Sequence, residues 1–144
     1  MNVGFIDLGT GMNSDGLPVA TKVLVFIIVP LKMAWKMPIA YLLIGGLNAN
    51  VKSNLVIEDI NRLQAVNVRI VSLICDDPST NFAVGAKLGA SLTAEYMKPV
   101  FRHPSRNEWV INIIVDAAHM LKLMRNTIDE KGILTDYAGK QIRW

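Results

Sequence analysis

The chain of 144 residues contains a single cysteine, Cys75, and only two histidines. One cysteine cannot form a disulfide within the chain, and two histidines are too few for a zinc site of the Cys/His type. These absences argue against a disulfide-rich secreted domain and a small zinc-binding module. They predict a protein of a reducing compartment.

Long hydrophobic runs are also absent. The longest extends from Val23 to Leu31, contains Pro30 and ends at Lys32, whereas a membrane-spanning helix needs roughly 20 apolar residues. The N-terminus has neither the basic start nor the small-residue cleavage site of a signal peptide. We therefore predict no membrane partner.

The composition allows a folded domain with a hydrophobic core. Hydrophobic residues make up 51% of the chain and charged residues 19%, which lies far from the composition of disordered proteins. The net charge is +3. Basic residues become more frequent in the later part, namely Lys98, Arg102, Arg106, Lys122, Arg125, Lys131, Lys140 and Arg143. Their distribution permits contact with phosphate groups, although scattered basic residues are more often simply solvated.

Hydrophobic periodicity and turn residues predict strands and helices along most of the chain. Strands are expected at residues 3–8, 21–29, 36–44, 68–75 and 108–115, and helices at 53–66, 80–88 and 117–128. Ser53 is the expected N-cap of the first helix, and Gly89 and Gly132 are expected to end the other two. Residues 91–107 are interpreted as an irregular basic connection, and residues 138–139 as the turn of a hairpin.

This order of elements predicts an α/β fold with a mixed sheet flanked by helices. Strands 21–29 and 36–44 are expected to pair antiparallel across a short connection, and the strands that alternate with helices are expected to be parallel. The order matches the ribonuclease-H-like fold. A flavodoxin-like or Rossmann sheet is the alternative, but the loop "GTGMNSDG" contains Gly-x-Gly without a helical pattern after it.

Acidic residues stand at the ends of predicted strands. Asp76 follows an apolar strand directly, Asp116 follows the next one, and Asp7 lies near the end of the first. If these strands are neighbours, the carboxylates converge at one edge of the sheet, where they would repel one another unless a cation such as Mg²⁺ lies between them. The alternative is that Asp76, Asp77 or Asp116 caps the helix that follows it.

Two further polar residues lie close to these acids in the sequence. His119 is one turn into the helix that follows Asp116, and it is interpreted either as a polar group of an active site or as a hydrogen-bonded structural residue. Cys75, immediately before Asp76, is expected to be a small core residue and not a nucleophile.

Five segments together resemble a known family. They are "GFIDLGTGMNSDGLPVATKVLVFIIV", "WKMPIAYLLIGGLNA", "VRIVSLICDDPSTNF", "KPVFRHPS" and "DAAHMLKLMRNTIDEKGILTD". In order and spacing they resemble the catalytic domain of P-element transposases and the related THAP-domain transposases of animals. The resemblance covers nearly the whole chain.

The resemblance implies a ribonuclease-H-like domain of an enzyme that cuts and joins DNA, with three acids, Mg²⁺ and a GTP-binding insertion before the last acid. Asp76 corresponds to the family's second acid and is the implied catalytic residue and metal ligand. The implied division is a partial catalytic domain at 1–131 and a hairpin at 132–144 that leads toward an absent GTP-binding domain. DNA is the implied partner, with homo-oligomers and a nuclear location as further expectations.

The chain also departs from the family pattern. The family's first acid is expected upstream of "GFIDLG" and the third after the insertion, so the first strand and the last helix of the fold are expected to be missing. Asp77 stands where glycine is common, and Ala117 and Ala118 stand where the family has Pro-Cys. We expect a fragment that is inactive alone. The alternatives are a non-enzymatic module that binds DNA or protein and an unrelated small-molecule enzyme with a pocket near "GTGMNSDG".

Overall fold

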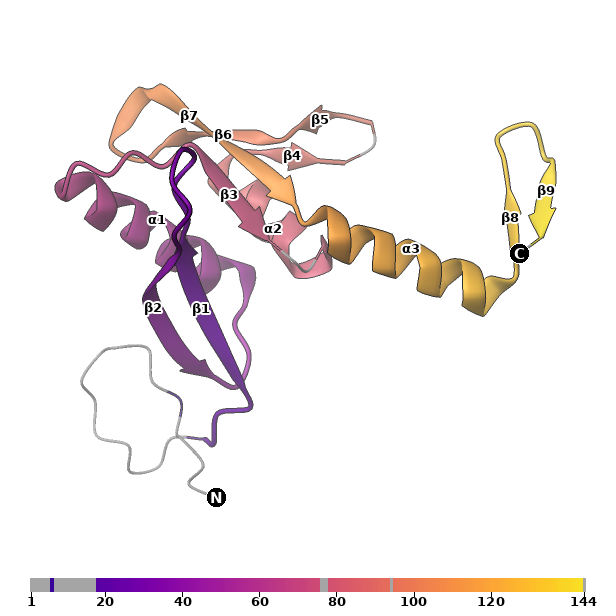
Figure 1. Cartoon of the computed structure of the whole chain (residues 1–144), viewed down its shortest axis with the longest axis horizontal. Helices are drawn as coiled ribbons and strands as arrows, with labels where there is room; N and C mark the ends of the chain where they lie inside the picture. The colour runs from indigo at the N-terminus through magenta and orange to yellow at the C-terminus, as the bar shows by residue number, and fades with distance from the viewer. Residues whose placement is uncertain (1–5, 7–17, 76–77, 94, 144) are drawn as a thin grey trace. The chain divides into compact units, whose positions relative to one another are not determined.

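The computed structural model describes residue 6 and residues 18–75, 78–93 and 95–143. The chain forms two compact units, Met1–Asn48 and Ala49–Trp144 (Figure 1), which we describe separately. Only residue 6 of the predicted strand at 3–8 is described, and the acid Asp7 and the loop "GTGMNSDG" lie outside the described residues. No helix in the described ranges is long and apolar enough to cross a membrane.

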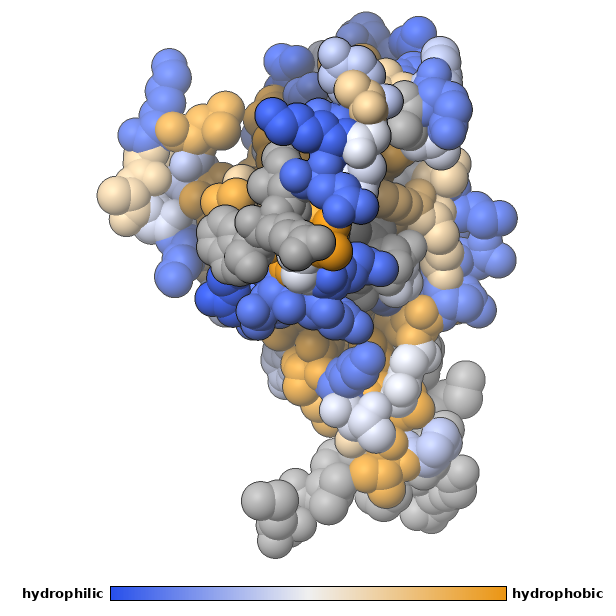
Figure 2. Space-filling view, turned by 90° about the vertical axis from the view of Figure 1, so that its right-hand side faces the viewer, coloured by the Kyte–Doolittle hydropathy of each residue, from blue (hydrophilic) through white to orange (hydrophobic). Residues whose placement is uncertain are grey.

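The first unit contains an antiparallel hairpin of β1 (Lys22–Ile28) and β2 (Met37–Ile44). The predicted pairing is therefore confirmed, with Lys22 opposite Ile44 and a bulge in the register after Phe26. Side chains alternate between the two faces of a strand: Leu42 and Ile44 are buried. The other face is apolar as well, and its exposed hydrophobic residues include Val23, Val25, Ile27 and Tyr41. Figure 2 shows that hydrophobic residues (orange) reach the surface between hydrophilic ones (blue).

The second unit is built on a three-stranded mixed sheet. Its strands are β3 (Ser72–Cys75), β7 (Arg106–Val115) and β6 (Val100–His103), in the order β3-β7-β6. β3 is parallel to β7, and β6 is antiparallel to it. The central strand β7 therefore positions both of its neighbours. A mixed sheet was predicted, but its antiparallel strand is β6 and not the hairpin of β1 and β2, which forms a sheet of its own.

Two helices cover one face of this sheet (Figure 1). They are α1 (Ala49–Ala65) and α2 (Pro78–Leu88). The buried apolar side chains in the described parts of the two helices are Val56, Ile60 and Val84, and those of the sheet are Phe101, Ile111 and Ile113. A Cβ at Gly85 of α2 would lie 3.2 Å from Cδ1 of Ile113, so a residue without a side chain allows this close approach of helix and sheet.

Helix α1 begins earlier than predicted, and Ser53 is not its N-cap. Ser53 lies inside the helix, is buried, and donates its hydroxyl to the carbonyl of Asn50 at 2.9 Å. The helix begins at Ala49 after Asn48, a residue type that favours the N-cap position. The segment "GGLNANVKS" has the composition of a loop, so the sequence pattern concealed this first turn.

Residues 91–107 are not irregular, which corrects the prediction. They contain the two-residue strands β4 (Ser91–Leu92) and β5 (Met97–Lys98), which pair antiparallel, followed by β6. Strands this short leave no periodic signal. β6 does alternate, since Phe101 and His103 are buried and Arg102 is exposed, but four residues between two prolines are easily read as a loop.

Strand β3 is shorter than the predicted strand at 68–75. Asn67 has a positive φ of 62°, and the Val68 N–H still donates to the Leu63 carbonyl at 2.9 Å. Residues 67 and 68 therefore belong to the turn that ends α1 and not to a strand. Regular pairing with β7 begins at Ser72, opposite Asn112.

The last predicted helix and the hairpin after it are confirmed. Helix α3 (Ala117–Lys131) ends at Gly132, whose φ of 66° is left-handed and whose N–H donates to the Ile128 carbonyl at 2.7 Å. Strands β8 (Ile133–Thr135) and β9 (Gln141–Arg143) then pair antiparallel. Helix α3 has no buried residue, and Leu121 is 67% exposed.

Candidate functional site

The carboxyl ends of β3 and β7 lie side by side. Cys75, the last residue of β3, pairs with Val115, the last residue of β7. The next residue along β7 is Asp116, whose N–H donates to the Cys75 carbonyl at 2.9 Å. The predicted convergence of the two strand ends is therefore confirmed for their backbones. Asp76 follows Cys75 in the chain but lies outside the described residues, so its role as catalytic residue and metal ligand stays a prediction.

Asp116 caps helix α3. Its Oδ1 accepts a hydrogen bond from the Ala118 N–H at 2.9 Å, which satisfies one of the backbone donors that the first turn of a helix leaves without a partner. The negative charge also lies at the positive end of the helix dipole. Of the two alternatives that the sequence left open for this acid, the helix cap is confirmed.

Replacing Asp116 with alanine should loosen the first turn of α3. The loss of a capping carboxylate costs about 1 kcal/mol. Because α3 buries no residue, we expect this cost to appear as local fraying. Hydrogen exchange of the Ala118 amide should become roughly fivefold faster. The Asp116→Asn variant keeps a capping oxygen and is the control; equal exchange rates in both variants would contradict the capping role.

A divalent cation would need several oxygen ligands at this edge. In the described part of the chain, no group of three or more His, Cys, Asp or Glu side chains lies close enough together to hold a metal ion. Asp116 contributes one carboxylate, one oxygen of which is engaged in the cap. The described residues, which do not include Asp76, therefore do not make up a magnesium site by themselves.

The other residues near this edge have structural contacts. Cys75 is half-buried, and its sulfur lies 4.0 Å from the Ile114 carbonyl oxygen. His119 is half-buried on the first turn of α3. Cys75 was expected to be a small core residue, but it is only half-buried and is not part of the core. The two interpretations of His119 stay open.

One perturbed carboxyl group lies away from the strand ends. Burial raises the pKa of Asp59 on α1, and the positive charge of Arg62 partly offsets that effect. Asp59 is half-buried, in agreement with this direction of the shift.

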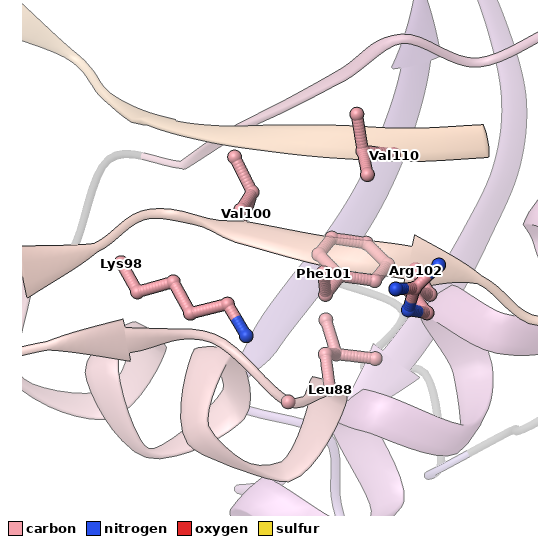
Figure 3. Close-up of a pocket in the computed structure, with 7 residues that line it drawn as sticks. Leu88, Lys98, Val100, Phe101, Arg102 and Val110 are labelled. Atoms are coloured by element: carbon pink, nitrogen blue, oxygen red, sulfur yellow. The ribbon is translucent and has the colours of Figure 1, made fainter. Parts of the chain in front are cut away.

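A cavity of about 300 Å³ opens beside β6 in the second unit. Its lining is mostly apolar, with Lys98 and Arg102 on opposite sides of Phe101 (Figure 3). The full lining is Leu88, Gly89, Lys98, Val100, Phe101, Arg102 and Val110. Because none of these residues is a carboxylate, the cavity is distinct from the predicted acid site.

A cluster of basic and aromatic side chains lies where β7 begins, and sequence reasoning missed it. The guanidinium carbons of Arg69 and Arg106 lie 4.5 and 5.9 Å from the ring centre of Trp109. His103 meets the same ring edge-on, at a centroid distance of 5.6 Å. Alternation along β7 predicts that Trp109 lies on the same face as Ile111. No pattern in the sequence predicts that Arg69 contacts Trp109.

Three comparisons with known proteins give consistent results. Residues 1–89 match the family model described as TNP-like, RNase H N-terminal domain. The human DNA transposase THAP9 is 25% identical over 124 residues, which are 85% of this chain and 14% of that protein. The Drosophila P element transposase strand transfer complex has a similar structure, with a TM-score of 0.67, 22% identity and coverage of 99% of this chain and 30% of that one. The chain therefore spans a minor part of the length of both proteins.

Proposed function

Since this chain belongs to the TNP-like family of RNase H N-terminal domains, we propose that it is part of the catalytic domain of a P-element-like DNA transposase. In the intact protein this domain would take part in metal-dependent DNA cleavage and strand transfer. The transposase relatives and the similar fold support the proposal. A nuclear location and assembly into homo-oligomers belong to the same proposal.

The observation that carries this proposal is the parallel, in-register pairing of β3 with β7. The Asp116 N–H bonded to the Cys75 carbonyl brings the ends of the two strands together. Ligands of open α/β sheets bind at the carboxyl ends of the strands. Asp76 is the next residue after β3, and we propose that its carboxylate is a ligand of Mg²⁺ in the complete active site.

We further propose that the chain alone does not cut DNA. Catalysis with two metal ions requires several carboxylates in fixed positions, and the family resemblance assigns to this chain one of the family's three acids, Asp76. The loss of metal ligands removes many orders of magnitude from the rate. The chain would then contribute one acid to a site that other segments complete.

A nicking assay tests this proposal. Supercoiled DNA is incubated with the wild-type chain, with Asp76→Ala and with Asp129→Ala, a matched loss of an exposed acid on α3, in buffers that contain Mg²⁺ or Mn²⁺. We expect no nicking by any of the three. Nicking by the wild type and by Asp129→Ala, but not by Asp76→Ala, would show an active enzyme and would overturn the proposed inactivity.

A non-enzymatic role in DNA binding is the second candidate. The observation that favours it is the pair of exposed arginines beside Trp109. Such a module would bind duplex DNA without cutting it, with an affinity that falls steeply as salt rises. Absence of binding at low salt would exclude this candidate.

A further inference from the structure

Arg69, Arg106 and Trp109 form a surface that we call the arginine–tryptophan surface. Both arginines are exposed, and Trp109 is half-buried. The guanidinium of Arg69 lies over the Trp109 ring at 4.5 Å, within the range of a cation–π interaction. His103, which is 1% exposed, contacts the ring at an interplanar angle of 85°. A buried side chain thus packs against the ring at a steep angle, and the guanidinium groups of Arg69 and Arg106 lie within cation–π range of the same ring.

The two arginines have no carboxylate partner in the part of the chain that the structure describes. The one salt bridge in these ranges joins Arg62 to Glu58 on α1. Glu108 lies two positions from Arg106 in β7, and its charge acts on the buried His103, but it forms no salt bridge with either arginine of the surface. The surface therefore presents two positive charges that form no salt bridge within the described part of the chain.

We propose that the arginine–tryptophan surface binds the phosphate backbone of duplex DNA. A guanidinium that stacks on a ring keeps the N–H groups at its edge available, and these groups match the oxygens of a phosphate. The stacking also restricts the long arginine side chain before binding, which lowers the entropy cost of each contact. Two guanidinium groups beside one ring can each bind one of two consecutive phosphates of DNA, whereas a ligand with a single carboxylate would occupy only one of them.

This inference rests on the proposed function, and it assigns a second DNA contact remote from the acids. Trp109 and Asp116 are seven positions apart in β7 and the residue after it, or roughly 23 Å at about 3.3 Å per residue. A duplex advances about 3.4 Å per base pair. The surface and the strand ends could therefore contact one duplex about six or seven base pairs apart.

Binding of a fluorescent duplex of about 20 base pairs, measured by anisotropy between roughly 50 and 200 mM salt, tests the inference. We expect the Arg69→Gln/Arg106→Gln variant to bind about tenfold more weakly at low salt. The slope of log affinity against log salt should decrease in magnitude by about 2, because each lost phosphate contact removes about 0.9. The slope is the more specific result, since a general loss of affinity leaves it unchanged.

The matched control removes the same charge elsewhere. Lys122→Gln/Arg125→Gln neutralises two exposed residues of α3, and Arg125 is hydrogen-bonded to Asn126 and not stacked on a ring. We expect its affinity to stay within about twofold of the wild type. If the α3 variant and the Arg69→Gln/Arg106→Gln variant lose the same affinity, net charge alone determines binding. That result would contradict a specific DNA-binding role of the arginine–tryptophan surface.

A lysine variant separates the stacked guanidinium from its charge. Arg69→Lys/Arg106→Lys keeps both charges and should fold like the wild type, which circular dichroism checks. We expect a severalfold loss of affinity, because lysine lacks the planar fork. If the glutamine and the lysine double variants of Arg69 and Arg106 both bind DNA with wild-type affinity, the surface does not bind DNA. That result would leave the proposed function intact. If the wild type itself does not bind duplex at low salt, both the surface and the DNA-binding role fail.

Discussion

The Ile111→Ala variant should lose roughly 2 to 5 kcal/mol of the free energy of unfolding of the second unit. Ile111 is 0% exposed in the central strand β7, opposite Phe101 of β6. Alanine would remove three carbons from the middle of the core, and the helices and strands around it can close the resulting cavity only in part. No other apolar position of this sheet is more completely buried in the described ranges.

Urea unfolding monitored by Trp109 fluorescence measures this loss, in a background of Trp35→Phe and Trp144→Phe that leaves one tryptophan. Ile114→Ala is the matched control, since the same side chain is shortened in the same strand. Ile114 is 48% exposed on the opposite face, so its truncation should cost about 1 kcal/mol or less. Similar losses in the two variants would contradict the assignment of the covered face of the sheet.

The second large effect is a loss of stability in acid that originates at His103. This side chain is 1% exposed, and its Nδ1 accepts a hydrogen bond from the Ser105 N–H at 3.1 Å. Burial lowers the pKa of His103 below its ordinary value of 6.5, the charge of Arg106 lowers it further, and Glu108 acts in the opposite direction. Protonation of Nδ1 would replace the acceptor with a second donor facing Ser105 and would bury a charge.

The direction of the pH effect follows from linkage. The unfolded chain binds a proton to this histidine at higher pH than the folded chain does, so unfolding takes up a proton as the pH falls. The contribution of His103 to stability is therefore fully present above about pH 6.5 and is lost progressively below it, through its lower folded pKa. The urea midpoint should decrease between about pH 7.5 and pH 5.

His103→Gln provides the test of this origin. Glutamine keeps a polar side chain but does not titrate, so the variant should be less stable at neutral pH and should lose the dependence on pH in this window. Retention of the full pH dependence in His103→Gln would assign it to another group. The NMR signals of the His103 ring would give the folded pKa directly.

Much of the architecture was predictable because the long elements carry a periodic signal. The hairpin of β1 and β2, the helices α1 and α2 and the central strand β7 each bury one recognisable face or are rich in β-branched residues. The cap at Asp116 and the left-handed end at Gly132 were among the expectations too, since each follows from local chemistry. In each of these cases the local preference and the tertiary packing favour the same structure.

The secondary-structure predictions are wrong where the sequence pattern is short or where the structure depends on contacts between residues far apart in the chain. Strands β4 and β5 are two residues long, and a pair of residues has no measurable period. Helix α1 begins inside a segment with the composition of a loop, and tertiary packing of Val56 and Ile60 overrides that composition. Local signals identified the ends of helices better than their beginnings in this chain.

The candidate site was predictable only in part, for a similar reason. Strand order predicted that Asp116 would stand beside the end of β3, and its backbone does so. The stacking of Arg69 on Trp109 joins residues far apart in the chain, and neither residue has a local pattern that indicates the other. Contacts of this kind depend on the register of β3 against β7, which becomes known only from the structure.

The parallel pairing of β3 with β7 also has a kinetic consequence. Residues of β3 meet partners about forty positions later in the chain, so a large loop must close before any of these backbone bonds can form. During synthesis on the ribosome, β3 would emerge first and remain unpaired until β7 has been synthesised. The end of the sheet at which Asp116 bonds to Cys75 is then among the last parts of the molecule to fold. Until β7 has been synthesised, the unpaired backbone groups of β3 can pair with strands of other nascent chains.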